Sequence, residues 1–219
     1  MPIIEHVVVF KVKQDVPLSE SEAMVDRINS LASLDQLLHL SMTPLHRIRS
    51  SSPSFNFTHI LHSRYSSKED LNAYTVHPRH VAAVKANSYF VQDIMALDFV
   101  AEDLQGESVL PRGSAVRVTF FKLKEGLENQ VKNEVLEAIR ETEIGVKNSV
   151  QFTCGENFSP GRAKGFSIAS IVVFPGISEL DADEGLGNYE KDDKIKEHLE
   201  NVVVLDFLVP SSPKAHSAS

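Results

Sequence analysis

The sequence predicts an α+β protein in which two ferredoxin-like repeats, each with an antiparallel sheet, pack back to back as a barrel within one chain. The opening run His6-Val-Val-Val-Phe-Lys-Val-Lys13 returns as Arg117-Val-Thr-Phe-Phe-Lys-Leu-Lys124, and the closing run Leu97-Asp-Phe-Val100 returns as Leu205-Asp-Phe-Leu208. Each half has the order strand, helix, strand, strand, helix, strand, which is typical of a split βαβ fold. The open face of such a sheet is apolar and needs a cover, which a second copy in the same chain supplies.

The elements of the first half follow from periodicity and end signals. The first strand is apolar on both faces, so we expect both faces to be covered. Its helix is expected over 19–33, with Ser19 and Glu22 as a capping box, and the later helical segment begins at a second box, Ser66 with Glu69. His77 precedes Pro78 and is expected to cap a new helix. The predicted strands are 5–13, 40–48, 55–65 and 94–101.

The repeat boundaries divide the chain into four parts. We predict a first repeat over 1–102 and a second, degenerate repeat over 114–209. The polar stretch 103–113, with Pro111, is the predicted linker. The tail, 210–219, is rich in Ser, Ala and Pro and is predicted to be disordered.

Composition and charge exclude several classes of partner. The 219 residues carry a net charge of −8, which removes the attraction to phosphate that nucleic-acid and anionic-membrane binders use. No apolar run approaches the ~20 residues that span a bilayer. The single cysteine, Cys154, has no disulfide or CxxC partner, which suits a reducing compartment and predicts a cytoplasmic protein. A peroxisomal location is a weaker alternative, because the last three residues only loosely match that signal.

The runs Tyr74-Thr-Val-His-Pro-Arg-His-Val81 and Thr58-His-Ile60 make the first half resemble the stress-responsive dimeric A/B barrel family, best known from plants. Its members are typically small homodimers, and one, olivetolic acid cyclase, cyclises a linear polyketide by an aldol reaction without a cofactor. The resemblance implies that His6, His59, Tyr74 and His80 lie near a ligand and that no cofactor is required. It also implies that Mg²⁺ could be held by backbone carbonyls near the end of the first helix.

An aldol condensation needs a base and a donor for the developing oxyanion. An imidazole suits the first task and a phenol hydroxyl the second, so His80 is the candidate general base and Tyr74 the candidate donor. His6 and His59 would line or orient the pocket, although a histidine on a strand is more often a packing residue. His77 and His80 stand three apart, but no nearby carboxylate completes a ligand set, so the sequence leaves any metal unassigned.

The second half loses this chemistry. His6 aligns with Arg117 and His59 with Ile168. The Tyr-x-x-His-Pro-x-His run has no counterpart, and the acidic stretch 181–193 stands in its place. Cys154 is expected to be a small buried residue rather than a nucleophile. We therefore interpret the second repeat as a scaffold that completes an intramolecular pseudo-dimer, and association of two chains into a homodimer stays open.

Three functions remain in competition. The first is binding of a small aromatic or polyketide-like ligand in the first repeat. The second is a cofactor-free cyclase that uses His80 and Tyr74, and the third is a structural or protective stress protein. A cavity of roughly 300 Å³ or more lined by the four candidates would favour ligand chemistry, whereas a filled barrel would favour the structural role.

Overall fold

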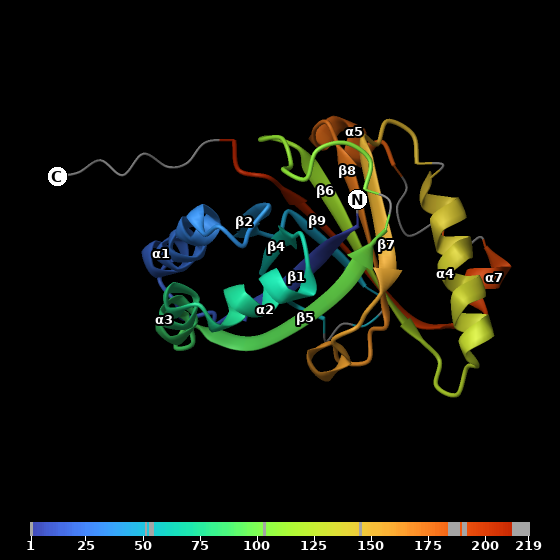
Figure 1. Cartoon of the computed structure of the whole chain (residues 1–219), viewed down its shortest axis with the longest axis horizontal. Helices are drawn as coiled ribbons and strands as arrows, with labels where there is room; N and C mark the ends of the chain where they lie inside the picture. Colours follow the sequence, from blue (N-terminus) through green and yellow to red (C-terminus); the bar gives the residue numbers. More distant parts are fainter. Residues whose placement is uncertain are drawn as a thin grey trace.

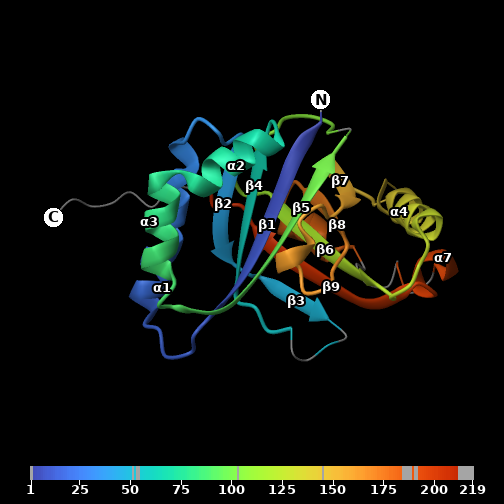
Figure 2. The same cartoon turned by 60° about the horizontal axis from the view of Figure 1, so that its bottom comes forward.

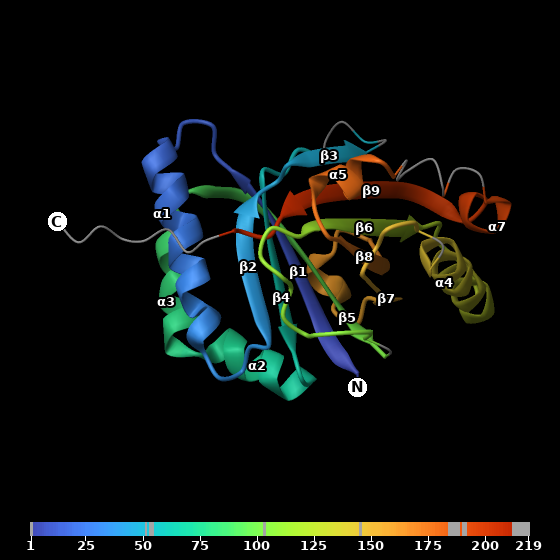
Figure 3. The same ribbon diagram turned by 90° about the horizontal axis from the view of Figure 1, so that it is seen from above.

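The protein has four layers, with two antiparallel sheets back to back between two layers of helices (Figure 1). The computed structural model describes residues 2–50, 52, 55–102, 104–144, 146–183, 189 and 192–211. Helices of the first repeat cover the outer face of one sheet, and helices of the second repeat cover the outer face of the other (Figure 3). The predicted fold class and the internal pseudo-dimer are confirmed.

The first repeat forms a sheet in the order β2-β4-β1-β5, which is the ferredoxin-like arrangement. Residues of even number on β1 face the helices and those of odd number face the second sheet, because side chains alternate along a strand. The elements are β1 (Ile3–Val12), α1 (Leu18–Asn29), the 3-10 turn η1 (Ser30–Ser33), β2 (His39–Pro44), β3 (Arg47–Ser50), β4 (His59–Tyr65), α2 (Lys68–Val76), α3 (Pro78–Asn87) and β5 (Val91–Ala101).

The second repeat forms the order β9-β6-β8-β7, with β3 of the first repeat added beside β9. Its helical cover is reduced to one long helix and short pieces. The elements are β6 (Ala115–Leu123), α4 (Asn129–Ile144), β7 (Gln151–Glu156), the 3-10 turn η2 (Pro160–Arg162), β8 (Ile168–Phe174), α5 (Ile177–Asp181), α7 (Asp193–Lys196) and β9 (Leu199–Leu208).

The repeats exchange the segments that follow their second strands. The prediction of one strand over 40–48 is wrong, because β2 ends at Pro44 and the chain then leaves the first sheet, so that β3 pairs with β9 of the other sheet (Figure 2). The His46 N–H donates to the Asp206 carbonyl over 2.9 Å. In return, the Phe158 N–H donates to the Asp98 carbonyl over 2.9 Å. Each repeat therefore adds a segment to one edge of the other repeat's sheet.

Two of the predicted helix starts shift by one residue. Helix α1 begins at Leu18 after Pro17, so Ser19 and Glu22 do not form a capping box. Helix α2 is capped by Ser67, whose extended backbone suits a cap and whose hydroxyl accepts the Asp70 N–H, so the predicted box at Ser66 and Glu69 is also wrong. The predicted cap of α3 is confirmed, since His77 Nδ1 accepts the Arg79 N–H over 3.1 Å.

The space between the sheets is filled by side chains from both repeats. A continuous apolar cluster joins β1, β4 and β5 to β6, β8 and β9, with Val7, Val9 and Phe120 fully buried. The contact between β5 and β7 is close, because a Cβ added at Gly155 would lie 2.7 Å from the Val100 carbonyl oxygen. This tight packing makes the two repeats one folding unit with a shared core.

A buried ionic cluster interrupts this core. Glu5 accepts hydrogen bonds from His62 Nε2 over 2.6 Å and from Arg64 Nε over 3.1 Å. Thr153, on β7 of the other repeat, donates its hydroxyl to Glu5 over 3.0 Å. Burial would raise the pKa of Glu5, but the charges of Arg64 and His62 outweigh it and lower that pKa to about 2. This cluster was not predicted from the sequence.

Two observations concern localisation. No helix in the described ranges is long and apolar enough to span a membrane. The predicted disordered tail lies outside the described residues from position 212 onward, and the residues compared with a peroxisomal signal lie there too.

Candidate functional site

Three of the four candidate residues lie in one row of rings between the first sheet and its helices. His6 on β1 contacts Tyr65 on β4 with ring centroids 6.2 Å apart, and Tyr65 contacts Tyr74 on α2 at 5.5 Å. Tyr74 then contacts His80 on α3 at 4.4 Å. Alternation along β1 and β4 turns His6 and Tyr65 toward the helices, where the two short helices bring Tyr74 and His80.

His6 is held by a buried carboxylate. The strand register places His6 opposite Asp98 on β5, and His6 Nδ1 hydrogen-bonds to Asp98 Oδ1. Burial would raise the pKa of Asp98, but the hydrogen bond and charge of His6 prevail and lower it, with help from Ser159 and Arg162. Asp98 is therefore a carboxylate at neutral pH, which fixes the orientation of the His6 ring.

Tyr74 brings a hydroxyl group without a partner into this row. Its side chain is 1% exposed, and within the described part of the chain its hydroxyl makes no hydrogen bond. Burial raises its pKa, so the phenol stays protonated and can donate. Tyr65, by contrast, has its hydroxyl 3.1 Å from Ser63 Oγ. A buried hydroxyl without a partner is a candidate contact for a ligand or an ordered water.

His80 is neutral at physiological pH and has a defined tautomer. Its Nδ1 lies 2.9 Å from the Thr75 carbonyl oxygen, which can only accept, so Nδ1 carries the proton and Nε2 is left as an acceptor. Burial is the main cause that lowers the pKa of His80, partly opposed by the bond to Thr75 and reinforced by its electrostatic interaction with His6. An imidazole in this state can take up a proton at Nε2.

His59 lies apart from the row. It faces the helices as alternation predicts, but it is opposite Phe10, whereas His6 is opposite Ser63. Four residues along β4 separate His59 from Ser63, which is about 13 Å in an extended strand. The His59 ring instead contacts Thr58 Oγ1 at 2.8 Å and Ser21 Oγ at 3.3 Å. The structure thus brings together His6, Tyr74 and His80, without His59.

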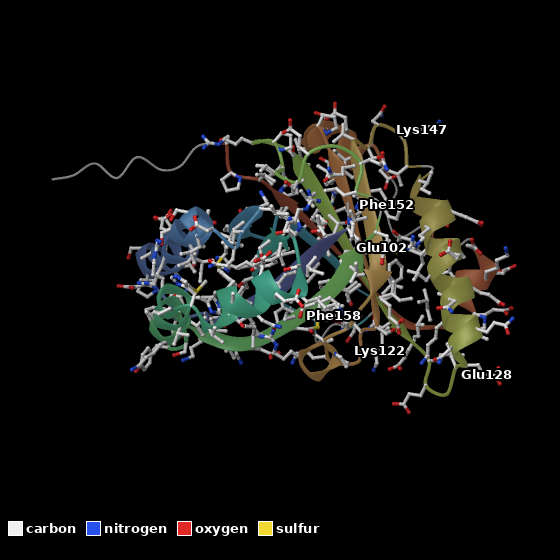
Figure 4. The ribbon with its side chains drawn as sticks, in the orientation of Figure 1. Glu102, Lys122, Glu128, Lys147, Phe152 and Phe158 are labelled. Atoms are coloured by element: carbon white, nitrogen blue, oxygen red, sulfur yellow. The ribbon has the colours of Figure 1, made fainter. Side chains whose placement is uncertain are left out.

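A cleft of about 560 Å³ opens beside this row. Asp98 forms part of its lining, with the exposed side of α2 on one wall and the loop after β7 on the other. Figure 4 labels Phe158, which lies where this loop of the second repeat approaches α2. The lining residues are Lys68, Leu71, Asn72, Thr75, Asp98, Phe158, Ser159 and Arg162. None of the four candidates from the sequence is among them, although Thr75 and Asp98 bond to His80 and His6.

The equivalent position of the second repeat is closed by arginines. Register places Arg117 opposite Asp206, as His6 is opposite Asp98, and Ile168 opposite Phe121, as His59 is opposite Phe10. Three guanidinium groups donate to the buried Asp206 carboxylate: Arg117 Nε over 2.9 Å, Arg47 Nε over 2.8 Å and Arg49 Nη2 over 3.0 Å. Arg47 and Arg49 come from β3 of the first repeat. The two repeats therefore share a backbone fold but differ at this position. The first repeat has a histidine bonded to Asp98, and the second has Asp206 bound by Arg117, Arg47 and Arg49, an arrangement that we call the ionic lock.

Side chains and backbone carbonyls are the two possible sources of metal ligands. Among the described residues, no three His, Cys, Asp or Glu side chains are grouped as metal ligands. Near the end of the first helix, the Ser30 carbonyl accepts the Arg79 guanidinium over 2.9 Å, and the Arg27 carbonyl accepts the Ser30 hydroxyl. A positive group already occupies this place, so these carbonyls do not fit a bound Mg²⁺. Cys154 is buried on β7, as expected.

Sequence reasoning missed Asp98 and the whole contribution of the second repeat to the cleft. Asp98 carried a signal, since an acidic residue inside the apolar run Leu97-Asp-Phe-Val100 needs a buried partner. Ser159 and Arg162 carried none. They reach the cleft only because the loop after β7 crosses to β5, where Asn157 bridges to Phe99.

Comparisons with known proteins agree with this architecture. The model of the stress responsive A/B barrel domain matches twice, over residues 4–101 and 115–209. Two stress-response A/B barrel domain-containing proteins of Arabidopsis thaliana are each 44% identical, one over 98% of this chain and 82% of its own length, the other over 96% and 98%. The structure of an anthrone oxidase-like protein aligns over 100% of this chain and 97% of its own, with a TM-score of 0.60 and 9% identity, which shows the shared fold alone.

Proposed function

Because the chain belongs to the stress-responsive A/B barrel family, we propose that this stress-response protein binds a small aromatic or polyketide-like molecule in its first repeat. The ligand would enter the cleft between α2 and the loop after β7 and reach the row formed by His6, Tyr74 and His80. Binding there requires no cofactor.

The contrast between the repeats carries this proposal. At equivalent positions, Asp206 is enclosed by three arginines, whereas Asp98 holds one histidine and lines an open cleft. If this position only stabilised the fold, the same group of arginines around the aspartate would be sufficient in both repeats. The Tyr74 hydroxyl, which has no partner among the described residues, adds a buried donor beside the cleft.

A thermal-shift screen against phenolic and polyketide-type compounds tests this function. We expect a hit to stabilise the wild-type chain and His59→Ala but not His80→Ala. The matched control is His59→Ala, which removes a buried imidazole of the same sheet-helix layer but lies outside the row. Hits that stabilise all three proteins equally would place the ligand elsewhere, and no hit with any protein would favour a structural or protective role.

The state of His80 supports a second candidate, a cofactor-free cyclase. In such a reaction His80 Nε2 would take a proton from a carbon between two carbonyls, and that carbon would attack a further carbonyl of the same chain. Tyr74 would donate to the alkoxide that forms, and the proton would return from His80 to that oxygen. Turnover of a linear poly-β-keto thioester should be lost in His80→Ala while the fold is kept. An unchanged rate would remove His80 from this role.

A further inference from the structure

The rim of the cleft holds two positive charges that come from different repeats. Lys68 lies in the first turn of α2, and its Nζ is 4.1 Å from the centre of the Phe158 ring. Arg162 ends η2 of the second repeat and is exposed. In the described ranges, the Arg162 guanidinium forms no hydrogen bond or ion pair, although its charge acts on both Asp98 and His80.

This placement stands out in an acidic protein. The chain has a net charge of −8, so an anion experiences no general attraction to its surface. Lys164, an exposed lysine close to Arg162 in the sequence, is by contrast paired with Asp93 over 2.9 Å. Among the residues that the structure describes, Arg162 has no such partner, so its guanidinium can bind a ligand in the cleft.

The rest of the lining includes apolar side chains from both repeats and a buried carboxylate. Leu71, which is 5% exposed, and Phe158 come from different repeats, and Phe158 packs against the apolar cluster that contains Leu71. Asp98 is a buried acceptor that repels a second carboxylate but can accept a hydrogen bond from a hydroxyl group. A ligand with both groups would therefore keep its hydroxyl toward Asp98 and its carboxylate at the rim.

We propose that the cleft recognises a carboxylate-bearing aromatic molecule, whose carboxylate is held by Arg162 and Lys68. This inference rests on the proposed function and specifies the ligand class of that site. It also gives the second repeat a direct part in binding, because Phe158, Ser159 and Arg162 all belong to it. Guanidinium groups suit this task because they bind carboxylates with two parallel hydrogen bonds.

A matched pair of probes isolates the carboxylate. Binding of 4-hydroxybenzoate and of its neutral methyl ester is measured by calorimetry on the wild-type chain and on Arg162→Gln, Lys68→Gln and Lys132→Gln. Lys132 lies on α4, on the far side of the molecule from α2 (Figure 1), and controls for the loss of one positive charge. Melting temperatures of all variants verify that the fold is intact.

We expect the acid to bind the wild-type chain more tightly than the ester and to lose about tenfold in affinity with Arg162→Gln. The ester should bind wild type and Arg162→Gln equally, Lys132→Gln should behave as wild type, and added salt should weaken only the acid. Equal binding of acid and ester, unchanged by Arg162→Gln, would overturn carboxylate recognition and leave the proposed function standing. Binding of neither probe would also overturn it, and the broader screen above judges the proposed function separately.

Discussion

Asp98 and Asp206 occupy equivalent positions in the two repeats, but Asp98 is bonded to a histidine and Asp206 to arginines. The backbone around the two residues is the same, since each lies opposite the middle of its repeat's first strand and the carbonyl of each accepts an N–H from the crossing segment of the other repeat. The difference therefore comes from side chains alone. It separates a position that can meet a ligand from one that joins the repeats.

Replacing Asp206 should strongly destabilise the protein. Asp206→Asn leaves the buried Arg117 and the two arginines of β3 without their shared carboxylate, and the expected loss is about 3 kcal/mol in the free energy of unfolding. Urea denaturation measures it. Asp93→Asn is the control, since its ion pair with Lys164 is half exposed and should contribute less than about 1 kcal/mol. Equal effects of the two substitutions would refute the ionic lock.

A second prediction concerns two buried threonine hydroxyl groups, of which Thr153 lies between the sheets and Thr119 faces the helices of the second repeat. Thr153→Val removes a hydrogen bond to the Glu5 carboxylate across the repeat interface and should cost about 2 kcal/mol. Thr119 is equally buried, but within the described residues its hydroxyl has no partner, so Thr119→Val should be neutral or stabilising. The same change of shape at two buried positions thus has different expected effects in chemical denaturation. A loss at Thr119 as large as that at Thr153 would contradict the argument.

The repeat pattern allowed the fold to be predicted, because alternation and apolar faces are local properties of the sequence. The exchange of β3 could not be predicted, since Arg47-Ile-Arg-Ser50 continues a strand pattern and only the tertiary arrangement decides which sheet it joins. The predicted cap at Ser66 is one residue early, because Ser66 and Ser67 both precede acidic residues at the right spacing and backbone geometry selects the second.

The candidate site could be predicted from the sequence only in part. Alternation placed His6 and His59 on the same side of the sheet, but periodicity does not give the distance along the strands. That distance separates His59 from the row of rings. Arg162 could not be found from sequence, since its position depends on the crossing of a loop from the second repeat.

Stability should fall in mild acid because of His39. Burial is the main cause that lowers its pKa from 6.5 to about 3, reinforced by the positive charges of His62 and Arg64 and opposed by Glu5. The unfolded chain therefore takes up this proton first, so stability is lost as the pH falls from 6.5 toward 3. His62 shifts in the same direction. Glu5, whose pKa falls from 4.5 to about 2, adds a further loss between those values.

This dependence can be assigned by substitution. His39→Gln should reduce the slope of unfolding free energy against pH by about 1.4 kcal/mol per pH unit between about pH 6 and 4, which corresponds to one proton. The slope is measured by urea denaturation at several pH values. His46→Gln, which removes an exposed imidazole, should keep the wild-type slope. An unchanged slope in His39→Gln would show that the acid sensitivity has another source.

Tyr74 should show opposite effects on stability and on binding. Tyr74→Phe removes a buried hydroxyl without a partner among the described residues, so the melting temperature should stay the same or rise. If this hydroxyl donates to the ligand, stabilisation by a hit from the phenolic screen should nevertheless be lost. Tyr65→Phe is the control, because it breaks the bond to Ser63 and should lower stability by about 1 kcal/mol while binding is kept. A Tyr74→Phe protein that is less stable and still binds would assign the hydroxyl to the fold, because only a structural contact gives that combination.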